Sequence, residues 1–129
     1  MIAPFCTLLE SARASGGAVP AFTVYGLEGA VGVLSAAEER GRNVVVLLSA
    51  ATLRSRAGGA LVTGVRALCE QATVAVPIQL DHATDLELIR AGLDSGVGAV
   101  MADASSEPFG ANVDFVARAV GSPRPTARP

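Results

Sequence analysis

Asp81 and His82 are the neighbouring residues of this sequence that are best suited to chemistry. They follow the apolar start of VPIQLDHATDLELIRAGLDSG, residues 76–96, and His82 is the only histidine in the chain. A carboxylate can exchange a proton with an alcohol, and an imidazole can bind a metal ion or transfer a proton. An ordinary strand end can carry the same two polar residues, and Asp81 could instead cap the following turn. The elements around the pair therefore have to show whether it belongs to a chemical site or to an ordinary strand end.

The basic residues argue against two classes of function. All ten are arginine, so this chain has no lysine amine for a Schiff-base or pyridoxal-phosphate enzyme. The formal net charge is -2 at pH 7, and the arginines are scattered along the chain without forming a basic stripe. Counterion release therefore has no basic field to drive the binding of nucleic acid. We expect neither covalent catalysis by lysine nor a nucleic-acid partner.

The composition indicates a globular chain without a membrane segment. Hydrophobic residues make up 50% and charged residues 17% of the sequence. The longest apolar run, residues 44–48, is far shorter than the roughly 18 to 20 residues that cross a bilayer. The N-terminus lacks the basic start and long apolar run of a secretion signal. Cys6 and Cys69 have no CxxC spacing, so we expect two buried or half-buried free thiols in a cytoplasmic protein.

Helical and strand patterns alternate along the chain. Residues 43–49 contain the continuous apolar run 44–48, which is typical of a strand buried on both faces. Thr84 followed by Glu87 has the pattern of a capping box. A proline-rich tail, residues 121–129, is expected to be disordered. The expected order is helix 5–15, strand 19–24, helix 27–41, strand 43–49, loop 50–59, helix 60–73, strand 74–80, helix 86–96, strand 98–102 and helix 112–120.

This alternation predicts parallel strands joined by right-handed crossovers, in one α/β domain over residues 1–120. Two architectures fit it: an open doubly wound sheet, or four of the eight units of a (β/α) barrel. In both, the carboxyl ends of the strands form the edge that carries chemistry. The polar residues at these four strand ends are Thr23, Ser49, the Asp81-His82 pair and Asp103.

Four segments carry a resemblance to a known family. They are VPAFTVYGLEGAVGVLSAAEE (19–39), VVVLLS (44–49), VPIQLDHATDLELIRAGLDSGVGAVMADAS (76–105) and PFGAN (108–112). In this order and at these intervals they resemble the N-terminal half of the class II, zinc-dependent ketose-bisphosphate aldolases, up to about residue 120. The resemblance implies a TIM-barrel fold class, with about four β/α units as a half barrel and a leading N-terminal helix.

The resemblance also implies roles for four residues. Asp81 matches the acid/base aspartate that exchanges a proton with the aldehyde oxygen, and His82 matches one of three zinc-ligand histidines. Asp103 matches an aspartate that holds a second metal ion in some members, and Ser49 matches a serine that contacts the substrate. The implied cofactor is Zn²⁺, and the implied reaction is reversible cleavage of a ketose bisphosphate, a small sugar phosphate. A chain without lysine is consistent with this metal route.

Other positions depart from the family pattern. Thr23 and Gly26 stand where asparagine is usual, Ala104 stands where glycine is usual, and residues 110–111 replace acidic residues. One histidine cannot supply the three protein ligands of a catalytic zinc site. We therefore expect a truncated chain that is impaired alone. The alternative is a non-catalytic remnant or assembly module, which pairs with another copy or with a missing C-terminal half.

Overall fold

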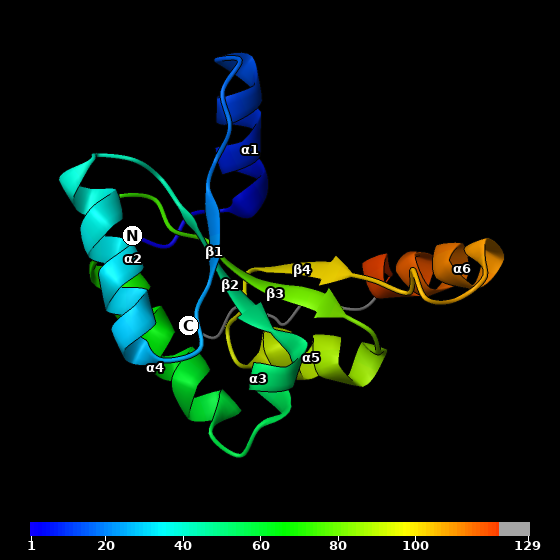
Figure 1. Cartoon of the computed structure of the whole chain (residues 1–129). Coiled ribbons are helices and arrows are strands. Elements are labelled where there is room, and N and C mark those ends of the chain that lie inside the picture. The colour runs from blue at the N-terminus through cyan, green and yellow to red at the C-terminus, as the bar shows by residue number, and fades with distance from the viewer. Residues whose placement is uncertain (122–129) are drawn as a thin grey trace.

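A computed structural model describes residues 1–121, so all of the predicted disordered tail except Gly121 lies outside the described part. The chain alternates between strands and helices after a leading helix, as the sequence predicts (Figure 1). The elements are α1 (Phe5–Ala14), β1 (Ala21–Thr23), α2 (Leu27–Glu39), β2 (Val45–Ser49), α3 (Ala50–Arg54), α4 (Gly58–Gln71), β3 (Ile78–Ala83), α5 (Leu86–Asp94), β4 (Ala99–Ala102) and α6 (Phe109–Val120).

The four strands form one parallel sheet in the order β1-β2-β3-β4. Each strand therefore pairs with the strand that follows it in the chain. A doubly wound sheet would reverse its strand order at a switch point, and this sheet does not. Consecutive order is that of a (β/α) barrel, so the structure decides between the two predicted architectures in favour of the half barrel.

The two faces of the sheet differ in their side chains. Val46, Leu48, Ile78 and Leu80 point to the helices and are buried in one hydrophobic core with residues of α2, α4, α5 and α6. Because side chains alternate along a strand, their neighbours point the other way, into the space that a closed barrel would enclose. The register places Thr23, Leu47, Gln79 and Ala99 in one row across this inner face.

The third strand begins and ends later than predicted. The expected strand was 74–80, and β3 runs from Ile78 to Ala83. Pro77 has no backbone N–H to donate, and the Val76 N–H donates to the carbonyl of Met1 rather than to a neighbouring strand. At the other end, pairing continues past the apolar run until the Asp103 N–H donates to Ala83. Asp81 and His82 therefore lie within β3.

Two further local predictions are wrong. The expected loop 50–59 contains the short helix α3, whose N-cap is Ser49. The predicted capping box at Thr84 is absent, because the Asp85 side chain accepts the N–H of Leu88 and is the N-cap of α5. Thr84 instead accepts a long hydrogen bond from Arg54, 3.4 Å between Nη2 and Oγ1, and Arg54 also forms an ion pair with Asp85.

Both cysteines are free, but only one is buried. Burial of Cys69 in the core raises the pKa of its thiol to about 11, whereas Cys6 is exposed on α1, against the prediction of two covered thiols. Because the thiolate is the reactive form, a disulfide reagent should modify one thiol per native chain and two after denaturation. A Cys6→Ser variant should show no native reaction. Rapid modification of that variant would contradict the burial of Cys69.

No helix among residues 1–121 is both long enough and apolar enough to cross a bilayer.

Candidate active site

The carboxyl ends of the four strands bring together the polar residues that the sequence singled out. We call this group the rim: Thr23, Ser49, Asp81, His82 and Asp103. Thr23 and Ser49 are the last residues of β1 and β2, and Asp103 directly follows β4. Ser49 pairs in register with Asp81 across β2 and β3. The rim therefore forms as predicted, because parallel strands in consecutive order place their carboxyl ends side by side.

His82 has an unusual backbone conformation. Its φ is 49°, the only positive φ of a non-glycine residue in the described chain, and it lies where the register between β3 and β4 shifts. Such a bulge re-aims a side chain, and a left-handed histidine is uncommon enough to indicate a constraint from its surroundings. Here the side chain turns toward β4, where the ring nitrogen Nδ1 lies 2.5 Å from Oδ2 of Asp103.

The Asp103 carboxylate is itself held by the loop after β4. Its second oxygen, Oδ1, accepts the backbone N–H of Ser105 at 2.9 Å. The next N–H, of Ala104, donates to the side-chain Oδ1 of Asn112 on α6 at 3.2 Å. Asn112 was not predicted as a site residue, although the segment PFGAN that contains it carried part of the resemblance. This asparagine fixes the loop whose carboxylate orients His82.

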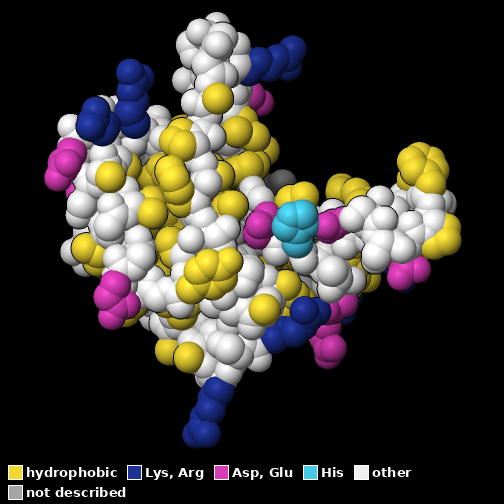
Figure 2. Space-filling view, in the orientation of Figure 1, with side chains coloured by type: hydrophobic (Ala, Val, Ile, Leu, Met, Phe, Trp, Pro, Cys, Tyr) yellow, Lys and Arg dark blue, Asp and Glu magenta, His cyan; other side chains and the backbone are white. Residues whose placement is uncertain are grey.

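These contacts shift the pKa values of both His82 and Asp103. The hydrogen bond to His82, with further bonds from Ser105, lowers the pKa of Asp103 to about 2. An ionised carboxylate only accepts hydrogen bonds, so His82 Nδ1 must be the donor. The bond to Asp103, together with the nearby charge of Asp81, raises the pKa of His82 above its usual value. The other ring nitrogen, Nε2, takes no part in this bond, and the imidazole is largely exposed. Figure 2 shows the histidine at the surface, with acidic side chains on both sides.

Ser49 has a structural role at the rim. Its hydroxyl oxygen accepts the Thr52 N–H at 3.1 Å and lies 2.8 Å from the Thr52 hydroxyl. In the structure Ser49 closes the turn from β2 into α3, as the N-cap of that helix. Contact with substrate stays a prediction. The bond to the Thr52 hydroxyl uses either the proton or the second lone pair of the Ser49 hydroxyl, and the other of the two is the group available to a substrate.

The rim supplies only part of a zinc site. A catalytic zinc site has three protein ligands, with a fourth position open. Within residues 1–121, no group of three or more histidine, cysteine, aspartate and glutamate side chains could hold a metal ion. His82 offers one imidazole nitrogen, and Asp103 already bonds to the other. The described residues therefore do not fit a complete zinc centre, and its remaining ligands would have to come from elsewhere.

Comparison with known proteins shows the family of this chain. Residues 4–124 match the sequence profile of the family described as fructose-bisphosphate aldolase class-II. The chain belongs to the class II fructose-bisphosphate aldolase family. Over 88% of its length it is 37% identical to the fructose-bisphosphate aldolase of Thermus caldophilus and 34% identical to that of Geobacillus stearothermophilus. The match covers 37% and 40% of those two proteins, so the chain spans about two-fifths of the relatives' length.

A solved structure extends the comparison to the fold. The YdjI aldolase of Escherichia coli K12 superposes with a TM-score of 0.88 and 26% sequence identity, over 94% of this chain and 46% of that protein. The half-barrel assignment is therefore confirmed. This chain matches less than half of that relative, and the rest of the relative lies outside the match.

Because His82 is the only histidine, its titration can test the hydrogen bond to Asp103 without overlapping signals. In the metal-free protein, the one imidazole resonance should titrate above its ordinary pKa of 6.5, because Asp103 and Asp81 both favour the protonated ring. Replacing Asp103 by asparagine removes the charged acceptor and should lower the titration midpoint. Asp94→Asn, at the far end of α5, is the matched control and should leave it unchanged. Equal midpoints in wild type and Asp103→Asn would contradict the hydrogen bond.

Proposed function

We propose that this chain carries the first half of an aldolase active site that reversibly cleaves a ketose bisphosphate into dihydroxyacetone phosphate and an aldehyde phosphate. The observation that carries this proposal is the juxtaposition of Asp81, His82 and Asp103 on one rim, in a chain of this family. Relatives named fructose-bisphosphate aldolases support the substrate class. The cytoplasmic location expected from the sequence remains a prediction.

Asp81 is the acid/base group in this proposal. It lies on the inner face of the sheet, in register with Ser49 and near the carboxyl end of β3. When the carbon-carbon bond breaks, the carboxylate takes the proton of the alcohol oxygen that becomes the aldehyde. In the reverse direction it returns the proton. In the neutral imidazole, the bond that Nδ1 donates to Asp103 fixes the tautomer in which Nε2 is unprotonated and directed away from that bond.

Zinc is the family cofactor that the sequence predicts, and the described residues provide one of its histidine positions, at His82. The described residues do not complete the ligand set of that metal. Ser49 is the proposed substrate contact, and its backbone position is fixed by the cap on α3. With these roles, we expect the isolated chain to be a weak catalyst and a completed barrel to be an active one.

A chimera tests the proposal. Residues 1–120 of this chain would replace the matched segment of the Thermus caldophilus aldolase, which supplies the remaining length. The folded chimera should bind zinc and cleave fructose 1,6-bisphosphate. Asp81→Asn should reduce kcat by about a hundredfold or more, the range of a lost acid/base group, while zinc stays bound.

Ser49→Ala is the companion variant, and it should raise KM more than it lowers kcat. A folded, zinc-loaded chimera without turnover would refute the catalytic assignment. That result would favour the non-catalytic assembly module that the sequence also allowed.

A further inference from the structure

Arg54 bonds to the segment that follows the rim residue His82. It is the last residue of α3, and its Nη2 atom lies 3.4 Å from Oγ1 of Thr84 and forms an ion pair with Oδ2 of Asp85. We call these three residues the clasp: Arg54, Thr84 and Asp85. The helix that ends with Arg54 begins at its N-cap Ser49, after β2, whereas Thr84 and Asp85 lie between β3 and α5. The clasp therefore joins the two segments that carry Ser49 and His82.

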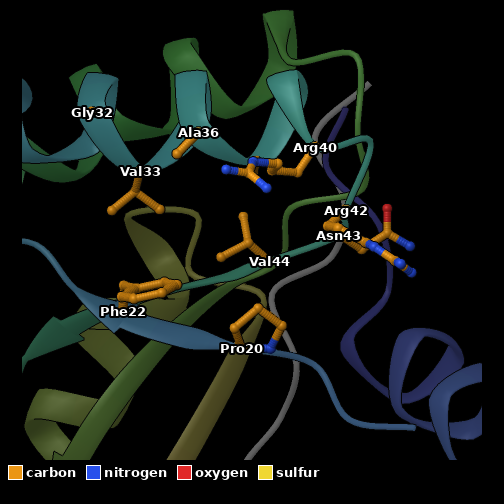
Figure 3. Close-up of a pocket in the computed structure, with 10 residues that line it drawn as sticks. Pro20, Phe22, Gly32, Val33, Ala36, Arg40, Arg42, Asn43 and Val44 are labelled. Carbon is orange, nitrogen blue, oxygen red and sulfur yellow. The ribbon is translucent and has the colours of Figure 1, made fainter.

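Two other arginines lie at the opposite edge of the sheet. Arg40 and Arg42 line a groove of about 420 Å³ between β1 and α2, together with Phe22 and Val44 (Figure 3). Val44 directly precedes β2, so this groove lies near the amino ends of the strands, whereas the rim lies at their carboxyl ends. No rim residue lines the groove. Arg54, in contrast, follows the carboxyl end of β2, where its charge can act on the rim.

Asp85 holds its side of the clasp in a fixed place. Its Oδ1 accepts the N–H of Leu88 at 2.7 Å, which makes Asp85 the N-cap of α5, and Oδ2 binds Arg54. The bond from Leu88, and after it the bond from Arg54, lowers the pKa of Asp85, so the carboxylate is ionised at neutral pH. Arg54 therefore makes a charge-assisted hydrogen bond to a group that is already anchored to a helix.

The short helix α3 brings Arg54 to this place. Its five residues are too few to form a stable helix alone, so its position depends on tertiary contacts. Ser49 caps its start, and Leu53 packs on α5, because a methyl group built on Gly92 would lie 3.4 Å from Leu53 Cδ2. Figure 1 shows α3 beside α5. Arg54 adds a polar contact between the same two helices, at the end of α3 that is remote from Ser49.

The clasp lies next to the unusual backbone conformation of the rim. Only Ala83 separates Thr84 from His82, whose φ is 49°. A left-handed conformation of a histidine costs free energy and persists only where the surrounding structure holds it. On the β4 side, the Asp103 N–H donates to the carbonyl of Ala83 at 2.9 Å. On the α3 side, Arg54 bonds to Thr84, so the segment after His82 is held from both sides.

We propose that Arg54 is a positioning residue of the candidate active site, which holds the segment after His82 against α3 and thereby sets the position of His82 relative to Ser49. The catalytic part of this inference rests on the proposed aldolase function, and the structural part does not. The side chains of Arg54 and Asp85 are about half exposed, at 49% and 45%, and such ion pairs contribute little to global stability. The expected effect of the clasp is therefore local to the rim.

Amide hydrogen exchange in the full chain tests the structural part. In Arg54→Gln, the Asp103 N–H should exchange at least about fivefold faster, because a hydrogen bond to a charged group is lost beside its acceptor, Ala83. The Val46 N–H, which donates to Pro77 in the same sheet, should keep its rate within about twofold. Equal acceleration of both amides would mean a loss of global stability alone and would overturn the proposal. An unchanged rate at Asp103 would also overturn it.

Two further variants separate the clasp from the loss of any surface ion pair. Arg66→Gln is the matched control, since the Arg66–Glu70 pair is equally exposed but lies within α4, and it should leave the Asp103 exchange rate unchanged. Asp85→Ser keeps an oxygen that can cap α5 but removes the carboxylate, so it should reproduce the effect of Arg54→Gln. The double variant should exchange no faster than either single variant. Additive effects would contradict a clasp that acts as one unit.

Kinetics in the chimera with the Thermus caldophilus aldolase test the catalytic part. Arg54→Gln should lower kcat by about tenfold or more with little change in KM, because a small displacement of a reacting group slows the chemical step. Arg54→Lys keeps the charge and should restore part of this loss. A raised KM with unchanged kcat would show that Arg54 binds a substrate phosphate instead, and would overturn the proposal. A wild-type chimera without turnover would refute the proposed function, whereas the exchange rates would still decide whether Arg54 positions the rim.

Discussion

Replacing Gly58 by alanine is expected to destabilise the protein by about 1–3 kcal/mol, the usual cost of forcing extra atoms into a packed site. Gly58 is the buried first residue of α4, where the chain turns back from α3. A methyl group there would lie 2.7 Å from the carbonyl oxygen of Thr52 and closer still to that of Leu53. Both atoms belong to the backbone of α3, so neither can swing aside. From the sequence, both glycines of the Gly58-Gly59 pair were expected to lie in the loop 50–59.

The adjacent glycine provides the control. Gly59 is exposed in α4, and a methyl group added there meets no atom within 4 Å. Because alanine favours a helix more than glycine does, Gly59→Ala should be neutral or should stabilise the protein by up to about 1 kcal/mol. Urea unfolding at a fixed protein concentration measures both variants. Equal effects of the two substitutions would contradict the close approach of α3 to α4.

Leu80→Ala should have the largest effect on stability, about 2–5 kcal/mol, as for other buried leucines. Leu80 is fully buried in β3 and points to the helices. A methyl group built on Gly92 would lie 3.1 Å from Leu80 Cδ2, so α5 approaches the sheet closely there. Removing the side chain would leave a cavity between β3 and α5 that the rigid sheet cannot close. The rim residues Asp81 and His82 directly follow Leu80 in β3, so their positions depend on the packing of this strand.

Leu9→Ala is the matched control for this cavity, since Leu9 is exposed on α1, which stands apart from the sheet in Figure 1. It should change the free energy of unfolding by no more than about 0.5 kcal/mol. Thermal or urea unfolding, followed by circular dichroism at one protein concentration, compares the two variants. A Leu80→Ala protein as stable as Leu9→Ala would show that β3 does not pack on α5 as described.

The sequence by itself determined the α/β class, the leading helix and the four strand-helix units. Those features follow from local patterns: the apolar run of residues 44–48 predicts a strand, and Gly41 predicts the end of the helix before it. The rim was also predictable, because parallel strands that alternate with helices carry their polar residues at one edge. Asp81, His82, Asp103 and Ser49 could therefore be selected from the chain alone.

Only the tertiary structure decided the strand order, the bulge at His82 and the partners of the rim residues. The order distinguishes a half barrel from a doubly wound sheet, and it depends on which strands meet in space. The shift of β3 to Ala83 depends on a hydrogen bond from Asp103, 20 positions further along the chain. Asn112 holds the Asp103 loop from a separate helix. Such contacts leave no local pattern in the sequence, because their energy comes from residues that become neighbours only on folding.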